Sequence, residues 1–153
     1  MLPPGQAAIS FANMAIKRVE PDEAARLMNE GWTYLDVRSV SEFEQGHPTG
    51  AFNIPLLDLV PGQGLRPNAS FLVEVKNSFP PDSRLVIGCK SGGRSARAAQ
   101  MMAEAGYTSV VDMRGGFGGE MDAGGQVSCA GWQARQLPVS TKAEPGRSYR
   151  ELK

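Results

Sequence analysis

The chain has 153 residues, the length of one ordinary domain, and a core of that size needs neither disulfides nor a metal ion to hold it. Sixteen Lys and Arg residues balance sixteen Asp and Glu residues, which argues against a bulk electrostatic grip on nucleic acid or on an anionic membrane. Two cysteines and one histidine are too few for a disulfide framework or a Cys/His zinc site. With no apolar run of about 18 residues and no basic residue ahead of the first apolar stretch, we expect a cytoplasmic protein.

The predicted elements follow from apolar periodicity and turn residues. In chain order they are a short strand at 16–19, a helix from Pro21 to about Gly31, a buried strand at 33–37, a short helix from Ser39 to Gly46, a helix at 70–79, a strand at 84–88, a helix at 95–105 and a strand at 109–113. Ser39 and Glu42 fit a capping box at the start of the short helix. The stretch 56–67 is predicted to be irregular. Strands that alternate with helices indicate βαβ units and a mainly parallel sheet, hence an α/β fold.

The ends of the chain differ in composition from its middle. Residues 1–14 contain Pro3, Pro4 and Gly5 and no clear period, so we expect an N-terminal arm. Residues 15–138 hold all the predicted elements and are interpreted as one domain. The polar residues 139–153 include Pro145 and Gly146 and are expected to form a loosely attached tail.

One segment combines a buried strand, a cysteine, a glycine-containing loop and a helix. Cys89 follows the strand at 84–88, and Gly92 and Gly93 permit backbone conformations in which successive amides point inward. Those amides, the following helix N-terminus and the cations Lys90 and Arg94 favour the thiolate form of Cys89 and the binding of an anion. The loop therefore predicts a nucleophilic cysteine at the carboxyl edge of the sheet, where open α/β sheets place their sites.

A structural interpretation of the same cysteine competes with this one. Free cysteine is often a small buried residue in an ordinary strand-to-helix turn. The two glycines and two cations packed directly after Cys89 weigh against that reading. The loop is not a P-loop, because the G-x-x-x-x-G-K-[ST] pattern is absent.

Three stretches together carry a family resemblance. Residues 89–95 read C-K-S-G-G-R-S; residues 36–55 contain D-V-R, E-F, G-H, G-A and N-I-P; residues 106–117 contain G-Y, V and G-G-F. In order and spacing they resemble the C-x-x-G-x-R-S active-site loop, the opening stretch and the closing segment of rhodanese-like domains, which are single-domain sulfurtransferases. The resemblance covers about residues 16–138.

The resemblance implies a small parallel sheet with helices on both faces and a sulfurtransferase that needs no cofactor or metal. A donor such as thiosulfate would give its sulfane sulfur to Cys89, and the resulting persulfide would pass it to cyanide or to a thiol acceptor, for example thioredoxin or another protein thiol. Lys90 and Arg94 would hold the anionic donor, and the loop Lys90, Ser91, Gly92, Gly93, Arg94 and Ser95 would form the substrate-binding site.

Four further residues of the opening stretch are interpreted as structural support. We expect Asp36 and Arg38 to form a buried pair that braces the loops, with Glu42 as a further partner of Arg38. His47 is placed with them, because Gly-His-Pro is typical of a turn and a thiolate already formed needs no general base. A catalytic His47 remains the less favoured alternative.

Two features depart from the resemblance or leave it open. Residues 118–131, which contain Cys129, stand where many family members have a tryptophan, so we expect an insertion or a rerouted last helix. Cys129 could instead resolve a persulfide as a disulfide, if it lay close enough to Cys89.

Two other functions compete with sulfur transfer. A phosphatase or arsenate reductase of the same fold and a non-catalytic binding module are the alternatives. The related phosphatases carry Cys-x5-Arg, whereas Cys89 to Arg94 is Cys-x4-Arg, and the shorter loop favours sulfur over phosphate.

Overall fold

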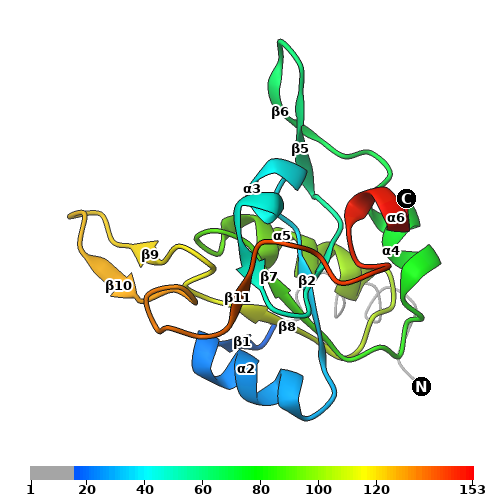
Figure 1. Ribbon diagram of the computed structural model, residues 1–153. Coiled ribbons are helices and arrows are strands. Elements are labelled where there is room, and N and C mark those ends of the chain that lie inside the picture. Colours follow the sequence, from blue (N-terminus) through cyan, green and yellow to red (C-terminus); the bar gives the residue numbers. More distant parts are fainter. Residues whose placement is uncertain (1–15) are drawn as a thin grey trace, which may run out of the picture.

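The computed structural model describes residues 16–153, so the arm predicted at 1–14 lies outside the described residues. Its centre is a parallel sheet of five strands in the order β1-β8-β7-β2-β4 (Figure 1). In that spatial order the strands are β1 (Arg18–Val19), β8 (Val110–Met113), β7 (Leu85–Gly88), β2 (Thr33–Asp36) and β4 (Phe52–Asn53). All four pairings are parallel, which confirms the predicted α/β fold with a parallel sheet. Within residues 16–153 no helix combines the length and apolarity that crossing a bilayer requires.

Alternating side chains of the strands feed two cores, one on each face of the sheet. Leu85 and Ile87 of β7 pack with helices α4 (Phe71–Ser78) and α5 (Gly93–Glu104), whereas Val86 packs on the side of helix α2 (Pro21–Asn29). Helices therefore cover both faces, as the resemblance implies. Both faces of β7 are buried, which explains its uninterrupted apolar sequence.

Local signals set the helix boundaries. Helix α2 has Pro21 in its first turn. Helix α3 (Val40–Gln45) opens with the predicted capping box, in which the Ser39 side chain and Glu42 each accept from the other's backbone amide. Helix α5 begins two residues before the predicted start at 95, because Gly92 takes a left-handed conformation and lets the backbone turn directly from loop into helix.

The prediction that 56–67 is irregular is wrong. This stretch forms an antiparallel hairpin of β5 (Leu57–Val60) and β6 (Gly64–Pro67), which projects from the body of the molecule (Figure 1). Gly62 and Gly64 have positive φ and allow the tight connection. Most of the hairpin is exposed and each strand has only four residues, so neither carries a sustained apolar alternation from which a strand would be recognised.

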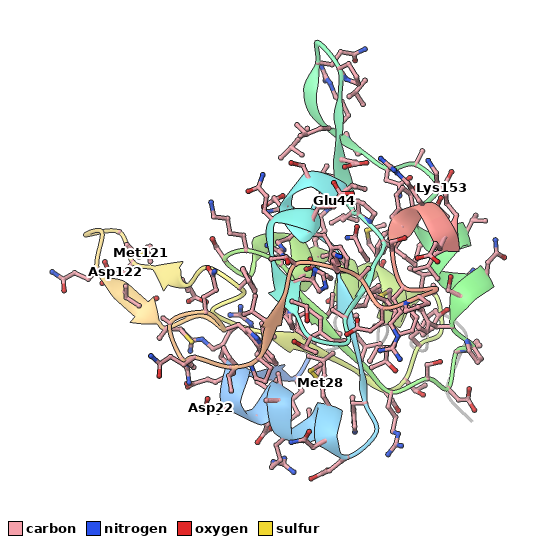
Figure 2. The ribbon with its side chains drawn as sticks, in the orientation of Figure 1. Asp22, Met28, Glu44, Met121, Asp122 and Lys153 are labelled. Atoms are coloured by element: carbon pink, nitrogen blue, oxygen red, sulfur yellow. The ribbon has the colours of Figure 1, made fainter. Side chains whose placement is uncertain are left out.

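A second hairpin occupies the segment expected to be an insertion or a rerouted helix. Strands β9 (Glu120–Met121) and β10 (Val127–Cys129) are antiparallel and extend away from the sheet. Figure 2 shows Met121 and Asp122 on this outlying arm. The segment is therefore a hairpin and not a rerouted helix.

The expectation of a loosely attached tail after residue 138 is wrong. Strand β11 (Val139–Ser140) pairs with β3 (His47–Pro48), and the chain ends in helix α6 (Tyr149–Leu152). Arg147 donates from its guanidinium to the carbonyl of Gly50, and the Tyr149 hydroxyl reaches the Glu74 carboxylate at 2.7 Å. The polar side chains of the tail thus hydrogen-bond to the domain surface.

Candidate active site

Cys89 lies immediately after β7, at the carboxyl edge of the sheet. Its side chain is 1% exposed, and the amide of Gly92 donates a hydrogen bond to Sγ at 3.0 Å. That amide faces the sulfur because Gly92 has φ of 111°, a conformation that favours glycine. The loop thus places a backbone donor against the sulfur, where negative charge on a thiolate or persulfide would be stabilised.

A second contact of the sulfur leads to a carboxylate that sequence reasoning missed. Sγ lies 3.4 Å from Ser95 Oγ, and Ser95 Oγ lies 2.5 Å from Oδ1 of Asp112 on β8. The other Asp112 oxygen accepts from Arg18 Nε at 2.9 Å. Burial raises the pKa of Asp112 above its ordinary value. The available signal was a carboxylate inside the otherwise apolar run of 109–113.

The structure corrects the expected partner of Glu42. Glu42 does not pair with Arg38; both its oxygens accept from the Arg94 guanidinium, at 2.7 and 3.0 Å. This hydrogen-bonded pair lowers the pKa of Glu42 to about 2 and raises that of Arg94. Arg94 was expected to hold an anionic donor, but a carboxylate already occupies its guanidinium.

Asp36 and Arg38 form a buried ion pair at the end of β2. The Arg38 guanidinium donates to both Asp36 oxygens and to the carbonyl of Gly46 at 2.7 Å, and its Cζ lies 4.5 Å from the centre of the Phe117 ring. Asn53 donates to the carbonyls of Asp36 and Arg38. The pair therefore ties the end of β2 to the turn after α3 and to the closing segment.

His47 lies in the interior beside α3. Its ring is fully buried, stacks on Phe43 at 3.8 Å between ring centres, and Nδ1 lies 2.7 Å from the Phe43 carbonyl. These contacts fix the turn between α3 and β3, and they agree with a supporting position for His47.

The remaining loop residues face solvent to different degrees. Ser91 and Gly93 are exposed, and Lys90 is exposed at the rim of a cavity of about 210 Å³. The cavity is lined by Arg38, Glu42, Gln45, Gly46, Lys90, Phe117, Gly118 and Gln133. Gln45 and Gln133 were not singled out from the sequence. Lys90 thus supplies a cation at the mouth of the site, where an anion approaching the loop would meet it.

The closing segment completes the loop from its other side. The amide of Phe117 donates to the Cys89 carbonyl at 2.7 Å, and that of Gly118 to the Lys90 carbonyl at 2.9 Å. Gly116, directly before Phe117, lies so close to the loop that a Cβ at this position would collide with the carbonyl of Lys90. The loop therefore holds its shape through backbone contacts with residues more than twenty positions later in the chain.

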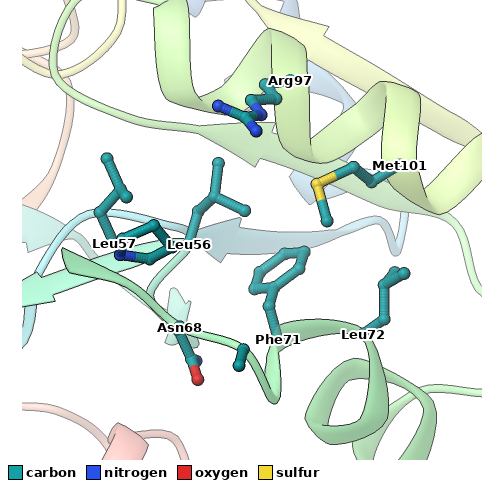
Figure 3. A pocket seen from close by; sticks show the side chains of 9 residues that line it. Leu56, Leu57, Asn68, Phe71, Leu72, Arg97 and Met101 are labelled. Carbon is teal, nitrogen blue, oxygen red and sulfur yellow. The ribbon is translucent and has the colours of Figure 1, made fainter.

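A separate apolar cavity of about 240 Å³ lies between α4, α5 and the start of the β5–β6 hairpin (Figure 3). Leu56, Phe71 and Met101 point into it, with Arg97 at its edge. None of the predicted site residues lines it, so the chemistry is assigned to the Cys89 loop.

Cys129 is a buried free thiol at the end of β10. Its sulfur lies 3.4 Å from the Arg135 guanidinium, which also pairs with Glu20 and Asp22. These contacts connect the β9–β10 hairpin to α2, and the resolving role considered for Cys129 stays a hypothesis.

Comparisons with known proteins agree with this geometry. A family model described as the rhodanese-like domain matches residues 20–119. The chain is 41% identical over 91 residues to thiosulfate sulfurtransferase 16 of Arabidopsis thaliana, a chloroplastic protein, covering 60% of this chain and 75% of that one. It is 37% identical over 116 residues to the chloroplastic rhodanese-like domain-containing protein 15 of the same plant, covering 76% of this chain and 57% of that longer protein.

Among solved structures, the crystal structure of Rv0390 from M. tuberculosis is similar with a TM-score of 0.68 and 27% identity. The similarity covers 82% of this chain and 98% of that one.

Proposed function

Because the chain belongs to the rhodanese-like domain family, we propose that it is a sulfurtransferase that carries sulfane sulfur on Cys89. The observation that carries the proposal is the position of the Cys89 sulfur at the carboxyl edge of the sheet, 3.0 Å from the amide of Gly92. Relatives that share this domain are named thiosulfate sulfurtransferases, which supports the same reaction class for this chain.

In the first half-reaction the Cys89 thiolate attacks the outer sulfur of a donor such as thiosulfate. A new S–S bond forms at Sγ, the S–S bond of the donor breaks, and sulfite leaves with the electron pair. The Gly92 amide stabilises the persulfide, and Lys90 at the rim attracts the dianionic donor. Arg94 contributes mainly by holding the loop against Glu42.

In the second half-reaction an acceptor takes the sulfur. A thiolate, on a small molecule or on a protein such as thioredoxin, or cyanide attacks the terminal sulfur of the persulfide, and Cys89 leaves as a thiolate. The amide of Gly92 stabilises that leaving group as it stabilised the nucleophile. The cycle returns the enzyme to its starting state and uses no cofactor.

Mass spectrometry tests the covalent intermediate. After incubation with thiosulfate, the peptide containing Cys89 should gain the mass of one sulfur atom, and a reductant should remove it. Cys89→Ser should show no gain and lose sulfur transfer almost completely, with an unchanged circular dichroism spectrum, because a serine hydroxyl ionises too weakly to attack sulfur at neutral pH. Cys129→Ser is the matched control and should keep most of the activity.

The same protein samples distinguish sulfur transfer from the two alternative functions. A phosphatase or arsenate reductase would turn over an aryl phosphate or arsenate through Cys89 and form no persulfide with any sulfur donor, and that result would overturn the proposal. Protein that binds thiosulfate without forming the adduct would instead indicate a non-catalytic module. One glycine inserted between Gly93 and Arg94 should weaken sulfur transfer, because it lengthens the loop and displaces Arg94 from Glu42.

A further inference from the structure

The hydroxyl of Ser95 has one proton and three neighbours that could share it. Ser95 Oγ lies 2.5 Å from Asp112 Oδ1, 3.2 Å from the carbonyl of Gly92 and 3.4 Å from Cys89 Sγ. A carboxylate is the strongest acceptor of the three and is also the nearest. The hydroxyl proton is therefore directed at Asp112, and a lone pair of Oγ faces the sulfur. In the thiol state the Cys89 proton points to Ser95.

The three groups lie in the interior. Cys89 and Asp112 are each 1% exposed, and Ser95 is fully buried. A proton on the sulfur has a short hydrogen-bonded path to a carboxylate, and bulk water has little access to either group. Asp112 is thus placed as a base, Ser95 as the intervening group and Cys89 as the nucleophile to be activated.

We propose that Asp112 accepts the thiol proton of Cys89 through the hydroxyl of Ser95. The thiol proton moves to Ser95 Oγ as the hydroxyl proton moves to Asp112 Oδ1, so one S–H and one O–H bond break and two O–H bonds form. The net charge of the cluster is unchanged, and no oxidant or reductant takes part. Cys89 becomes a thiolate that accepts hydrogen bonds from Ser95 and Gly92, and Asp112 becomes a neutral acid that donates to Ser95.

The groups around Asp112 permit this exchange. Arg18 on β1 donates to its other oxygen at 2.9 Å and favours the carboxylate. The charge of Glu120 on β9 disfavours it, and the buried Tyr34 on β2 is affected by the charge of Asp112 through space. Burial is the largest influence and raises the pKa of Asp112, which brings its proton affinity closer to that of a thiol.

Further polar groups surround the Cys89 sulfur. Besides the Gly92 amide that donates to the sulfur, the charge of Cys89 is among the influences that raise the pKa of Arg94 and of Tyr34. The inference rests on the proposed sulfur transfer. In that reaction Asp112 would hold the proton while Cys89 attacks the donor, and would return it to Cys89 after the acceptor has taken the sulfur.

The test measures alkylation of Cys89 by iodoacetamide against pH, because alkylation reports the thiolate and involves no sulfur donor. Asp112→Asn keeps the shape and an acceptor for Ser95 but cannot take the proton. It should slow alkylation at mildly acidic pH by about tenfold and shift the titration to higher pH. Asp82→Asn, which alters an exposed carboxylate in the turn before β7, is the control and should leave the curve unchanged.

Ser95→Ala tests the route and serves if Asp112→Asn does not fold. It removes the intervening hydroxyl and should shift the curve in the same direction, and the double variant should be no slower than the single ones, because the two residues act in series. Alkylation of Asp112→Asn as fast as wild type, or faster, would overturn the proposal, since the carboxylate would then only repel the thiolate. A normal curve for Ser95→Ala would overturn the route. Neither result bears on whether Cys89 forms a persulfide.

Discussion

The two ion pairs beside Cys89 differ in their exposure to water. The side chains of Asp36 and Arg38 are 1% and 5% exposed, whereas those of Glu42 and Arg94 are 27% and 19% exposed. A buried pair costs a large desolvation penalty and is held by its surrounding hydrogen bonds, so it fixes geometry more than it adds stability. The half-buried pair remains open to protons and should respond to acid.

Glu42→Gln should remove a pH-dependent part of the stability. The pKa of Glu42 falls from 4.5 to about 2 on folding, so the pair stabilises the fold above pH 4.5 and the contribution is lost as the pH falls toward 2. Partial exposure reduces the contribution at neutral pH to about 1–2 kcal/mol. Urea unfolding of wild type and variant across this range should show the two stabilities converging in acid.

The control for that series is Glu44→Gln, on the exposed side of α3 (Figure 2). It should give a curve parallel to that of wild type. If the Glu42→Gln curve is also parallel to wild type, the Arg94 pair makes no linked contribution and the interpretation of the site geometry fails.

The two loop cations should behave differently in kinetics. Lys90→Ala should raise KM for thiosulfate by about tenfold with little change in kcat, and should affect a neutral donor less, since it removes an exposed charge that attracts anions. Arg94→Ala should lower kcat with both donor types and lower the melting temperature, because it releases Glu42 and the loop together. Losses of equal size and kind in the two variants would contradict this division.

The sequence predicts those site residues whose roles depend on near neighbours. The capping box of Ser39 with Glu42 and the strand–Cys89–loop segment are local patterns, and the structure contains both. The pairing of Glu42 with Arg94 spans 52 positions and depends on how α3 and α5 meet at the sheet edge. No local rule gives that distance, so Arg38 was the natural but wrong partner to expect for Glu42.

At the scale of elements, buried segments were predictable and exposed ones were not. Strand β7 is apolar throughout, and β2 and β8 are largely apolar with Asp36 and Asp112 as their charged residues, because both faces of these strands are covered. That composition predicts them. The β5–β6 hairpin is held by its ladder of backbone hydrogen bonds and has exposed Leu59 and Leu65, so it carries no burial pattern. The contacts of the tail likewise depend on hydrogen bonds to distant residues, to the Gly50 carbonyl and to the Glu74 carboxylate.

Gly116→Ala should damage both stability and activity. A Cβ at this position meets the carbonyl of Lys90, and the backbone has φ of 59°, so the closing segment must move away from the Cys89 loop. We expect a loss of about 2–4 kcal/mol and sulfur transfer reduced far more than for the control Gly125→Ala. Gly125 also has a positive φ, of 80°, but a Cβ there meets nothing within 4 Å.

Urea unfolding and a thiosulfate assay of both glycine variants separate backbone strain from the contact. Because the strain is common to the two, their difference reports the close approach of Gly116 to the loop. Equal behaviour of the two variants would show that the closing segment does not shape the site.

At the scale of the whole molecule, the tail should stabilise the domain. Truncation after Gly146 removes the Arg147 contact with Gly50 and the Tyr149 contact with Glu74. We expect the free energy of unfolding to fall by about 2–3 kcal/mol, the worth of a few partly exposed hydrogen bonds to charged groups. Tyr149→Phe should account for about 1 kcal/mol of it. If truncation left the urea midpoint unchanged, the tail would contribute nothing to stability and would be loosely attached, as the sequence had suggested.

The strand order has a consequence for folding during synthesis on the ribosome. Arg18 on the edge strand β1 sits opposite Asp112 on β8, 94 positions later, and the Cys89 loop is closed by the amides of Phe117 and Gly118. A chain growing on a ribosome exposes β1 long before β8 has been made, and it contains Cys89 before the residues that enclose it. The edge strand β1 and the Cys89 loop can therefore take their final places only after synthesis has passed the closing segment. Until then the nascent thiol lacks the surroundings that would make it reactive.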